Sequence, residues 1–169
     1  MAWKSGVNSP LGYPVPGNVE TTEVVPVGSR ARFYDDTQGE GEFIFLPGVA
    51  STVAGDIVDY DLTPGAEATV RHTNATASNK GSPVAFATAA TVASTYGWYQ
   101  IFGVTIANVL AAFADNGVIF GTATAGSVDD AADAGDQILN ARGVSAIDTP
   151  STGKAYVQIA YPFVQGQIT

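Results

Sequence analysis

The 169-residue sequence contains no cysteine, one histidine and few charged side chains. Without cysteine the chain forms no disulfide and has neither a thiolate metal site nor a cysteine nucleophile. A Ser-His-Asp triad would have to include His72, and no G-x-S-x-G sequence marks a nucleophile. The nucleotide-binding sequence G-x-G-x-x-G and the P-loop are absent too. These absences predict that the protein is not an enzyme and uses no cofactor.

Charge is scarce and mostly negative. Charged residues make up 14% of the chain, where an ordinary soluble domain has about 25%. The net charge of −9 repels phosphate backbones, so we expect no nucleic-acid partner. No apolar run approaches the roughly 18 residues that would suggest a membrane span. Low charge together with a mean hydropathy of +0.14 predicts that part of the surface is covered, by copies of the chain in a dimer or trimer or by a larger assembly.

The first residues lack a basic segment followed by an apolar stretch, which predicts synthesis in a cytoplasm without secretion. Residues 1–29 are interrupted too often by proline and glycine to form a helix or a long strand. We interpret them as an extended arm that lies across a partner surface, and residues 30–169 as one domain. The alternative is a terminus wrapped on its own domain. The apolar side chains available for contact in this arm are Tyr13, Val15, Val24 and Val25.

Short segments typical of β-strands alternate with turns after residue 30. Residues 43–46 form a continuous apolar run, as expected of a strand that is covered on both faces. Residues 57–61 and 155–161 alternate between apolar and polar side chains. Turn residues recur every eight to twelve positions, which predicts an all-β fold, an antiparallel sandwich, jelly roll or small barrel.

One stretch has helical spacing instead. Ile106, Val109, Leu110 and Phe113 would share one face of a helix in an alanine-rich segment. The spacing favours one short helix near residues 105–114 over a strand.

Aromatic residues concentrate in residues 96–102, where both faces of a strand would be apolar. The first interpretation is a central core strand. A second is that Trp98 anchors a protein–protein interface. A third, a platform that stacks on sugars, has support only from Gln100.

His72 ends a predicted strand, and we expect it at a surface or strand end without a catalytic or metal-binding role. Two groups of carboxylates could bind calcium weakly, but the second lacks the residue pattern of an EF-hand loop. We therefore interpret them as solvated polar faces and predict no metal site. They are Asp56, Asp59 and Asp61 in the first group and Asp129, Asp130, Asp133 and Asp136 in the second.

Several segments resemble small structural proteins of tailed phages, akin to capsid cement or decoration proteins. The resemblance spans roughly residues 38–163 and is carried by GEFIFLPGVAST (41–52), GDIVDYD (55–61), ASTYGWYQIFG (93–103), FGTATAGSVDD (120–130) and GDQI (135–138). It implies a jelly-roll-like β-sandwich that binds the outer face of an icosahedral shell as an oligomer, with the major capsid protein as partner. The location it implies is the capsid exterior of the virion. The alternative is a carbohydrate-binding β-sandwich of a phage fibre or other surface appendage.

Overall fold

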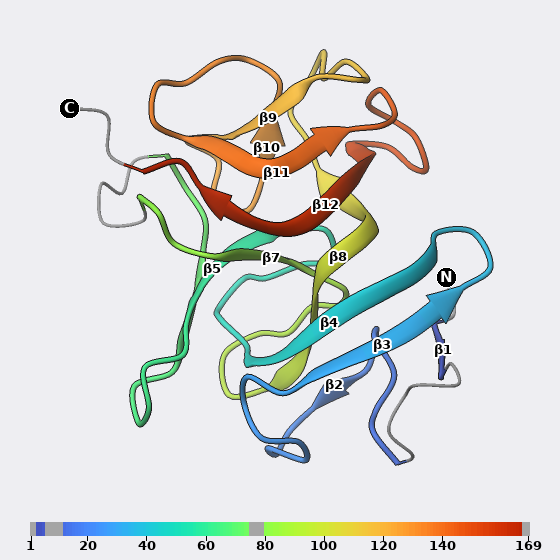
Figure 1. Ribbon diagram of the computed structural model, residues 1–169, viewed down its shortest axis with the longest axis vertical. Helices are drawn as coiled ribbons and strands as arrows, with labels where there is room; N and C mark the ends of the chain where they lie inside the picture. The colour runs from blue at the N-terminus through green and yellow to red at the C-terminus, as the bar shows by residue number, and fades with distance from the viewer. Residues whose placement is uncertain (1–2, 6–11, 75–79, 167–169) are drawn as a thin grey trace.

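The computed structural model describes residues 3–5, 12–74 and 80–166 (Figure 1). Throughout these ranges the regular structure is antiparallel β-sheet, with no helix, and so no helix that could cross a membrane. The prediction of an all-β, antiparallel, sandwich-like domain is confirmed.

The described residues form twelve strands. They are β1 (Lys4–Ser5), β2 (Val19–Glu20), β3 (Arg30–Asp35), β4 (Gly39–Pro47), β5 (Ile57–Asp61), β6 (Ala68–Arg71), β7 (Val84–Ala87), β8 (Tyr96–Asn108), β9 (Val118–Gly121), β10 (Val128–Asp129), β11 (Gln137–Gly143) and β12 (Lys154–Val164). The main path through the sheet is β1-β3-β4-β8-β12-β11-β9-β10. Off this path, β2 and β7 pair with β8, and β5 pairs with β6 and β7.

Strand β8 joins the two halves of the molecule. Its first part pairs with β4, β7 and β2, and its second part pairs with β12. Gly103 lies where the pairing changes, with a φ of 102°. A Cβ there would lie 2.6 Å from the carbonyl oxygen of Glu40, so this bend needs glycine. In Figure 1, β8 accordingly runs from the β3–β4 half toward the β11–β12 half.

The second part of β4 and the first part of β8 are buried on both faces, which explains the continuous apolar run in residues 43–46. Ile44 and Tyr99 pack on one face, in a core shared with β5 and β7. Phe45 and Trp98 pack on the other face. A third core lies between β7 and the sheet formed by the second part of β8, β12, β11 and β9.

The described part of residues 1–29 covers the face that carries Trp98. Val25 is 1% exposed and Trp3 is 8% exposed, and both belong to the same core cluster as Trp98. Strand β1 pairs with β3, and β2 pairs with β8. The structure therefore places this segment on its own domain, which was the alternative to a free arm.

The prediction of a helix near residues 105–114 is wrong. Strand β8 continues to Asn108 and pairs with β12 from Phe102 to Asn108. Thr105, Ala107 and Val109 are buried at every second position, which is the strand period. Long-range pairing with β12 has overridden the local helical spacing.

Candidate functional site

The five residues predicted as an interface do not form one exposed surface. Trp98 is 1% exposed, so it is a core residue and the prediction that it anchors an interface is wrong. Val25 is equally buried. Tyr13 and Val15 are partly buried against the same core, and the Tyr13 ring centroid lies 6.1 Å from that of Trp98. Of the five, only Val24 is largely exposed, at 51%.

A different set of residues forms an exposed surface, which we call the aromatic face. It consists of Arg30 and Arg32 from β3, Glu42 from β4, Phe102 from β8 and Tyr161 from β12. Phe102 is 41% exposed and Tyr161 is 45% exposed, and their ring centroids lie 5.7 Å apart. These two rings thus form one exposed apolar contact area.

Charged groups hold the aromatic face in place. The Tyr161 hydroxyl donates to Glu42 Oε2 at 3.0 Å, and Arg32 Nε donates to the same oxygen at 3.3 Å. The guanidinium carbon of Arg30 lies 5.9 Å from the centroid of the Tyr161 ring, a cation–π distance. The pKa of Tyr161 is raised, mainly by desolvation and to a smaller extent by the hydrogen bond with Glu42. The pKa of Arg32 is also raised, mainly by its own hydrogen bond with Glu42.

The backbone of the aromatic face is strained. Tyr161 has a φ of 53°, and Asn140 on the neighbouring strand has a φ of 60°. They lie at a register shift between β11 and β12. A bulky residue in this conformation costs of order 1–3 kcal/mol, and such strain concentrates at functional sites. Beside Phe102, a groove of about 460 Å³ is lined in part by Arg142 and Gln158.

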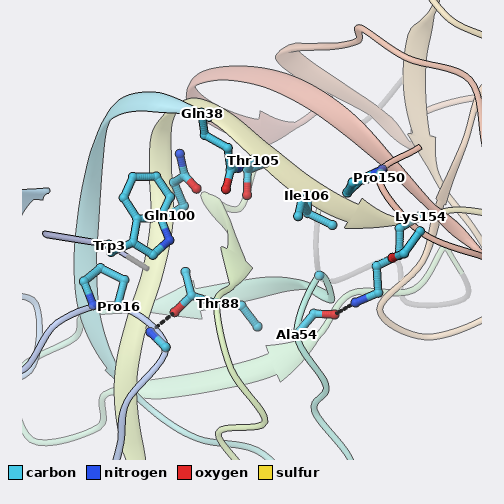
Figure 2. A pocket seen from close by; sticks show the side chains of 14 residues that line it. Trp3, Pro16, Gln38, Ala54, Thr88, Gln100, Thr105, Ile106, Pro150 and Lys154 are labelled. Atoms are coloured by element: carbon cyan, nitrogen blue, oxygen red, sulfur yellow. Dashed lines mark hydrogen bonds between the residues drawn. The ribbon is translucent and has the colours of Figure 1, made fainter. Parts of the chain in front are cut away.

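A second concave feature lies between residues 16–17, the second part of β8 and the loop before β12. This cleft has a volume of about 340 Å³ (Figure 2). Trp3, Gln38, Gln100, Thr105 and Lys154 are among the side chains that line it. Its walls combine an indole ring, two amides, a hydroxyl and an ammonium group, which is the composition of a small-molecule site.

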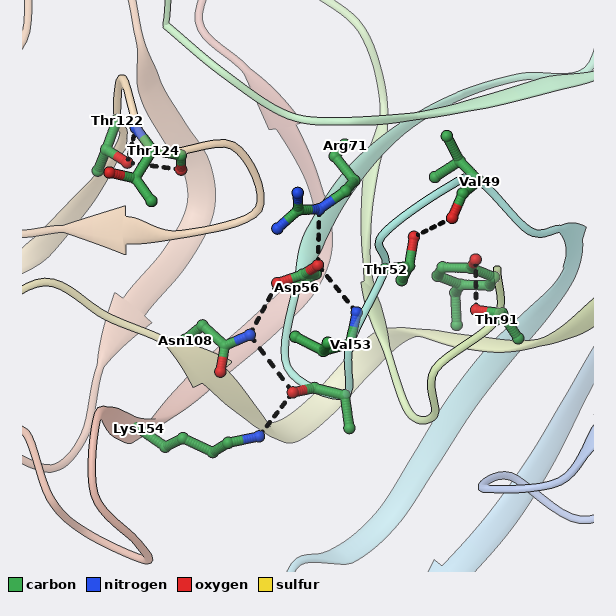
Figure 3. A network of polar contacts seen from close by, with 12 residues as sticks. Val49, Thr52, Val53, Asp56, Arg71, Thr91, Asn108, Thr122, Thr124 and Lys154 are labelled. Atoms are coloured by element: carbon green, nitrogen blue, oxygen red, sulfur yellow. Dashed lines mark hydrogen bonds and ion pairs between the residues drawn. The ribbon is translucent and has the colours of Figure 1, made fainter. Parts of the chain in front are cut away.

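A buried polar network supports the cleft (Figure 3). The Asp56 carboxylate is nearly inaccessible and accepts hydrogen bonds from Arg71 Nε at 2.8 Å and Asn108 Nδ2 at 2.7 Å. Lys154 Nζ donates to the carbonyl oxygen of Ala54 at 2.6 Å. These contacts fix the 53–56 loop against β6, β8 and β12, and with it one wall of the cleft.

His72 follows β6 directly, which agrees with the strand-end position that was one of the two predicted; it is not at the surface, because its side chain is fully buried. Its Nδ1 lies 3.0 Å from both carboxylate oxygens of Asp59. Its Nε2 has no hydrogen-bond partner among the described residues and faces Gly121, where a Cβ would approach it to 2.2 Å. The pairing of β6 with β5 brings His72 to Asp59, and nothing in the local sequence signals it.

The carboxylates are not gathered around a metal. Within the described ranges, no group of three or more histidine, aspartate or glutamate side chains is placed to hold an ion. Asp61 accepts from Thr63, whose hydrogen bonds lower the pKa of Asp61, and Asp136 pairs with Lys80. The interpretation as solvated faces is wrong for Asp56, Asp59 and Asp136, which are buried and bonded to other side chains.

No protein-family model, curated protein or solved structure matches the chain. The aromatic face and the cleft are therefore interpreted from their own residues. Neither was predicted from the sequence, because Glu42, Phe102 and Tyr161 come together only through the pairing of β4, β8 and β12.

Proposed function

We propose that this chain is a virion structural protein, a cement or decoration protein that binds the outer surface of a tailed-phage capsid. Its partners are the major capsid protein and further copies of itself in a dimer or trimer. The aromatic face is the observation that carries the proposal. The low charge content and the resemblance of residues 38–163 to phage head proteins support it.

The composition of the aromatic face suits protein docking. Aromatic residues and arginine are the residue types enriched in the energetically dominant parts of protein interfaces. Phe102 and Tyr161 offer two adjoining rings, and Glu42 holds Tyr161 in one orientation. Because these side chains are already ordered, docking loses less conformational entropy than it would with free side chains.

A protein of this kind would stabilise the capsid by binding at many equivalent sites on the shell. A subunit that binds only the assembled shell stabilises that shell by mass action. In a dimer or trimer, once one subunit has bound the shell, its neighbour binds the shell at a high effective concentration. Tight binding of the oligomer therefore needs only a modest affinity of each subunit. Docking of the aromatic face across the boundary between capsomers would in this way strengthen contacts between them.

The test is co-sedimentation with intact capsids of the phage that encodes the chain. We expect the wild type to sediment with the shells, and the double variant Phe102→Ser/Tyr161→Ala to lose at least about tenfold in affinity. Val70→Ser is the matched control, since Val70 is 52% exposed on β6, outside the aromatic face. It should bind as the wild type does.

Thermal unfolding of both variants shows whether they remain folded. Failure of the wild-type protein to sediment with capsids would overturn the capsid-binding function. Undiminished binding by a folded double variant would instead show that the aromatic face is not the docking surface.

A further inference from the structure

One buried acceptor in the cleft has no partner. Gln38 is 9% exposed, and its Oε1 accepts no hydrogen bond from the described residues and is almost closed to solvent, so a ligand group reaches it only when the amide shifts toward the cleft. An unpaired buried acceptor costs of order 1–3 kcal/mol, so such a group calls for a donor. Gln38 lies at the end of the turn that leads into β4, and its side chain reaches the top of the cleft (Figure 2).

The orientation of the Gln38 amide is fixed by its neighbours. Its Nε2 donates to the carbonyl oxygen of Val104 at 2.9 Å. The Nε2 of Gln100 donates to the same oxygen, also at 2.9 Å. An amide flipped the other way would bring its own oxygen against the Val104 carbonyl. The free group at Gln38 is therefore an oxygen, which can only accept.

The occupant of the cleft must consequently donate a hydrogen bond. Carboxylates and fully ionised phosphate groups offer only acceptors and would leave Gln38 Oε1 unpaired. An ammonium ligand would need a carboxylate, and none of the described residues that line the cleft carries one. Neutral donors such as hydroxyl groups remain. At the opposite side, Lys154 Nζ uses one of its three donors on the Ala54 carbonyl, which leaves donors for a ligand oxygen.

Apolar surfaces make up much of the remaining wall. Trp3, Pro16, Ile106 and Pro150 line the cleft between its polar ends. A sugar ring in the pyranose form carries hydroxyl groups at its rim and C–H groups on its faces, so it matches both kinds of wall. The volume of about 340 Å³ is at the lower end of the range for ligand pockets, roughly 300–1,000 Å³, which suits one sugar ring.

We propose that this cleft binds a single neutral pyranose unit, with a ring hydroxyl donating to Gln38 Oε1 and Lys154 Nζ donating to a sugar oxygen. This binding site is separate from the aromatic face and does not depend on capsid docking. Trp3 and Pro16 come from the N-terminal segment, whereas Gln38 comes from the turn between β3 and β4 and Lys154 from β12. A bound sugar therefore also fastens the N-terminal segment to the sheet, and it should raise the unfolding temperature of the protein.

The test is titration of the full chain with glucose, galactose, mannose, rhamnose and N-acetylglucosamine, followed by ¹H–¹⁵N correlation spectra and calorimetry. We expect saturable binding of at least one sugar, with shifts of the side-chain amide signals of Gln38 and Gln100. Gln38→Leu should weaken binding about tenfold or more, because it removes the acceptor. Gln158→Leu is the matched control, since Gln158 is exposed on β12 outside the cleft. It should leave binding unchanged.

An independent variant guards against a folding defect in Gln38→Leu. Ile106→Trp fills the cleft from a half-buried position on β8 and should also abolish binding. The ligand could be a free monosaccharide or the terminal sugar of a longer chain, and an oligosaccharide that ends in the same sugar distinguishes the two. If the oligosaccharide binds as well as the free sugar, the cleft accepts chain ends. No saturable binding of any of these sugars would overturn the proposal. Binding that is equally tight in a folded Gln38→Leu variant would overturn it too.

Discussion

The indole N–H of Trp98 donates a hydrogen bond to the carbonyl oxygen of Pro14 at 2.6 Å, across 84 positions of sequence. The bond ties the N-terminal segment to the sheet face that it covers. Trp98 is buried there beside Phe33 and Phe45, with ring centroids 5.5 Å and 5.3 Å away. The segment thus contributes to the core of the domain.

Removal of residues 1–28 should therefore destabilise the whole domain. The loss uncovers Trp98 and removes buried side chains, among them Trp3 and Val25, each worth roughly 1.5–3 kcal/mol or more. We expect the free energy of unfolding to fall by about 5 kcal/mol, measured by urea denaturation. Val24→Ser in the full chain is the control and should change stability little, because Val24 is exposed. A truncated chain as stable as the full chain would show that the segment contributes nothing to the core.

His72→Ala should be strongly destabilising, because His72 is fully buried and bonded to Asp59. The substitution removes a buried imidazole and its hydrogen bond to Asp59, which leaves a cavity. We expect a loss of about 3 kcal/mol or more in the free energy of unfolding. Val70→Ala, two positions earlier on the exposed side of β6, should cost much less. Equal effects of the two substitutions would contradict a structural role for the His72–Asp59 pair.

Gly126→Ala should disrupt the Asp56 network. Gly126 has a φ of 84°, and a Cβ there would lie 2.5 Å from the carboxyl carbon of Asp56. Gly65→Ala is the matched control: Gly65 has a φ of 78°, but a Cβ there meets nothing within 4 Å. In both variants an alanine at positive φ lowers the free energy of unfolding by about 1–2 kcal/mol. At Gly126 alone, the clash of the added Cβ with Asp56 lowers it by roughly a further 1–3 kcal/mol. Equal unfolding free energies for the two variants would mean that Asp56 moves aside without cost.

Tyr99 should make stability depend on alkaline pH. Burial raises the pKa of Tyr99 from 10.0 to about 12, against a smaller opposite effect of the hydrogen bond from Thr91. Above pH 10 the unfolded chain ionises this phenol while the folded chain keeps it neutral. The neutral Tyr99 phenol therefore contributes fully to the free energy of unfolding below pH 10. That free energy falls by about 2–3 kcal/mol as the pH rises to about 12.

Urea denaturation between pH 9 and pH 12 measures this loss. Tyr99→Phe should show a flatter profile than the wild type, because phenylalanine has no proton to lose. Tyr34→Phe is the control, since Tyr34 is 45% exposed, and its profile should follow that of the wild type. Parallel profiles for the wild type and Tyr99→Phe would rule out a raised pKa at Tyr99.

The sequence by itself determined three of the strands, β4, β5 and β12. The apolar run at residues 43–46 and the alternation at residues 57–61 and 155–161 lie within β4, β5 and β12. These patterns can be read locally because side chains on a strand repeat every two residues, and because a strand covered on both faces is apolar throughout. Proline and glycine marked the turns between them for the same local reason.

Only the tertiary structure decided which apolar residues are exposed. On a regular strand Trp98 and Phe102 share a face, yet Trp98 is buried and Phe102 is exposed. The register shift between β4 and β8 falls between these two residues and breaks the alternation. Tyr161 and Glu42, which hold the aromatic face together, are 119 positions apart in sequence. Contacts of that range depend on which strands pair, and a local pattern carries no information about the partner strand.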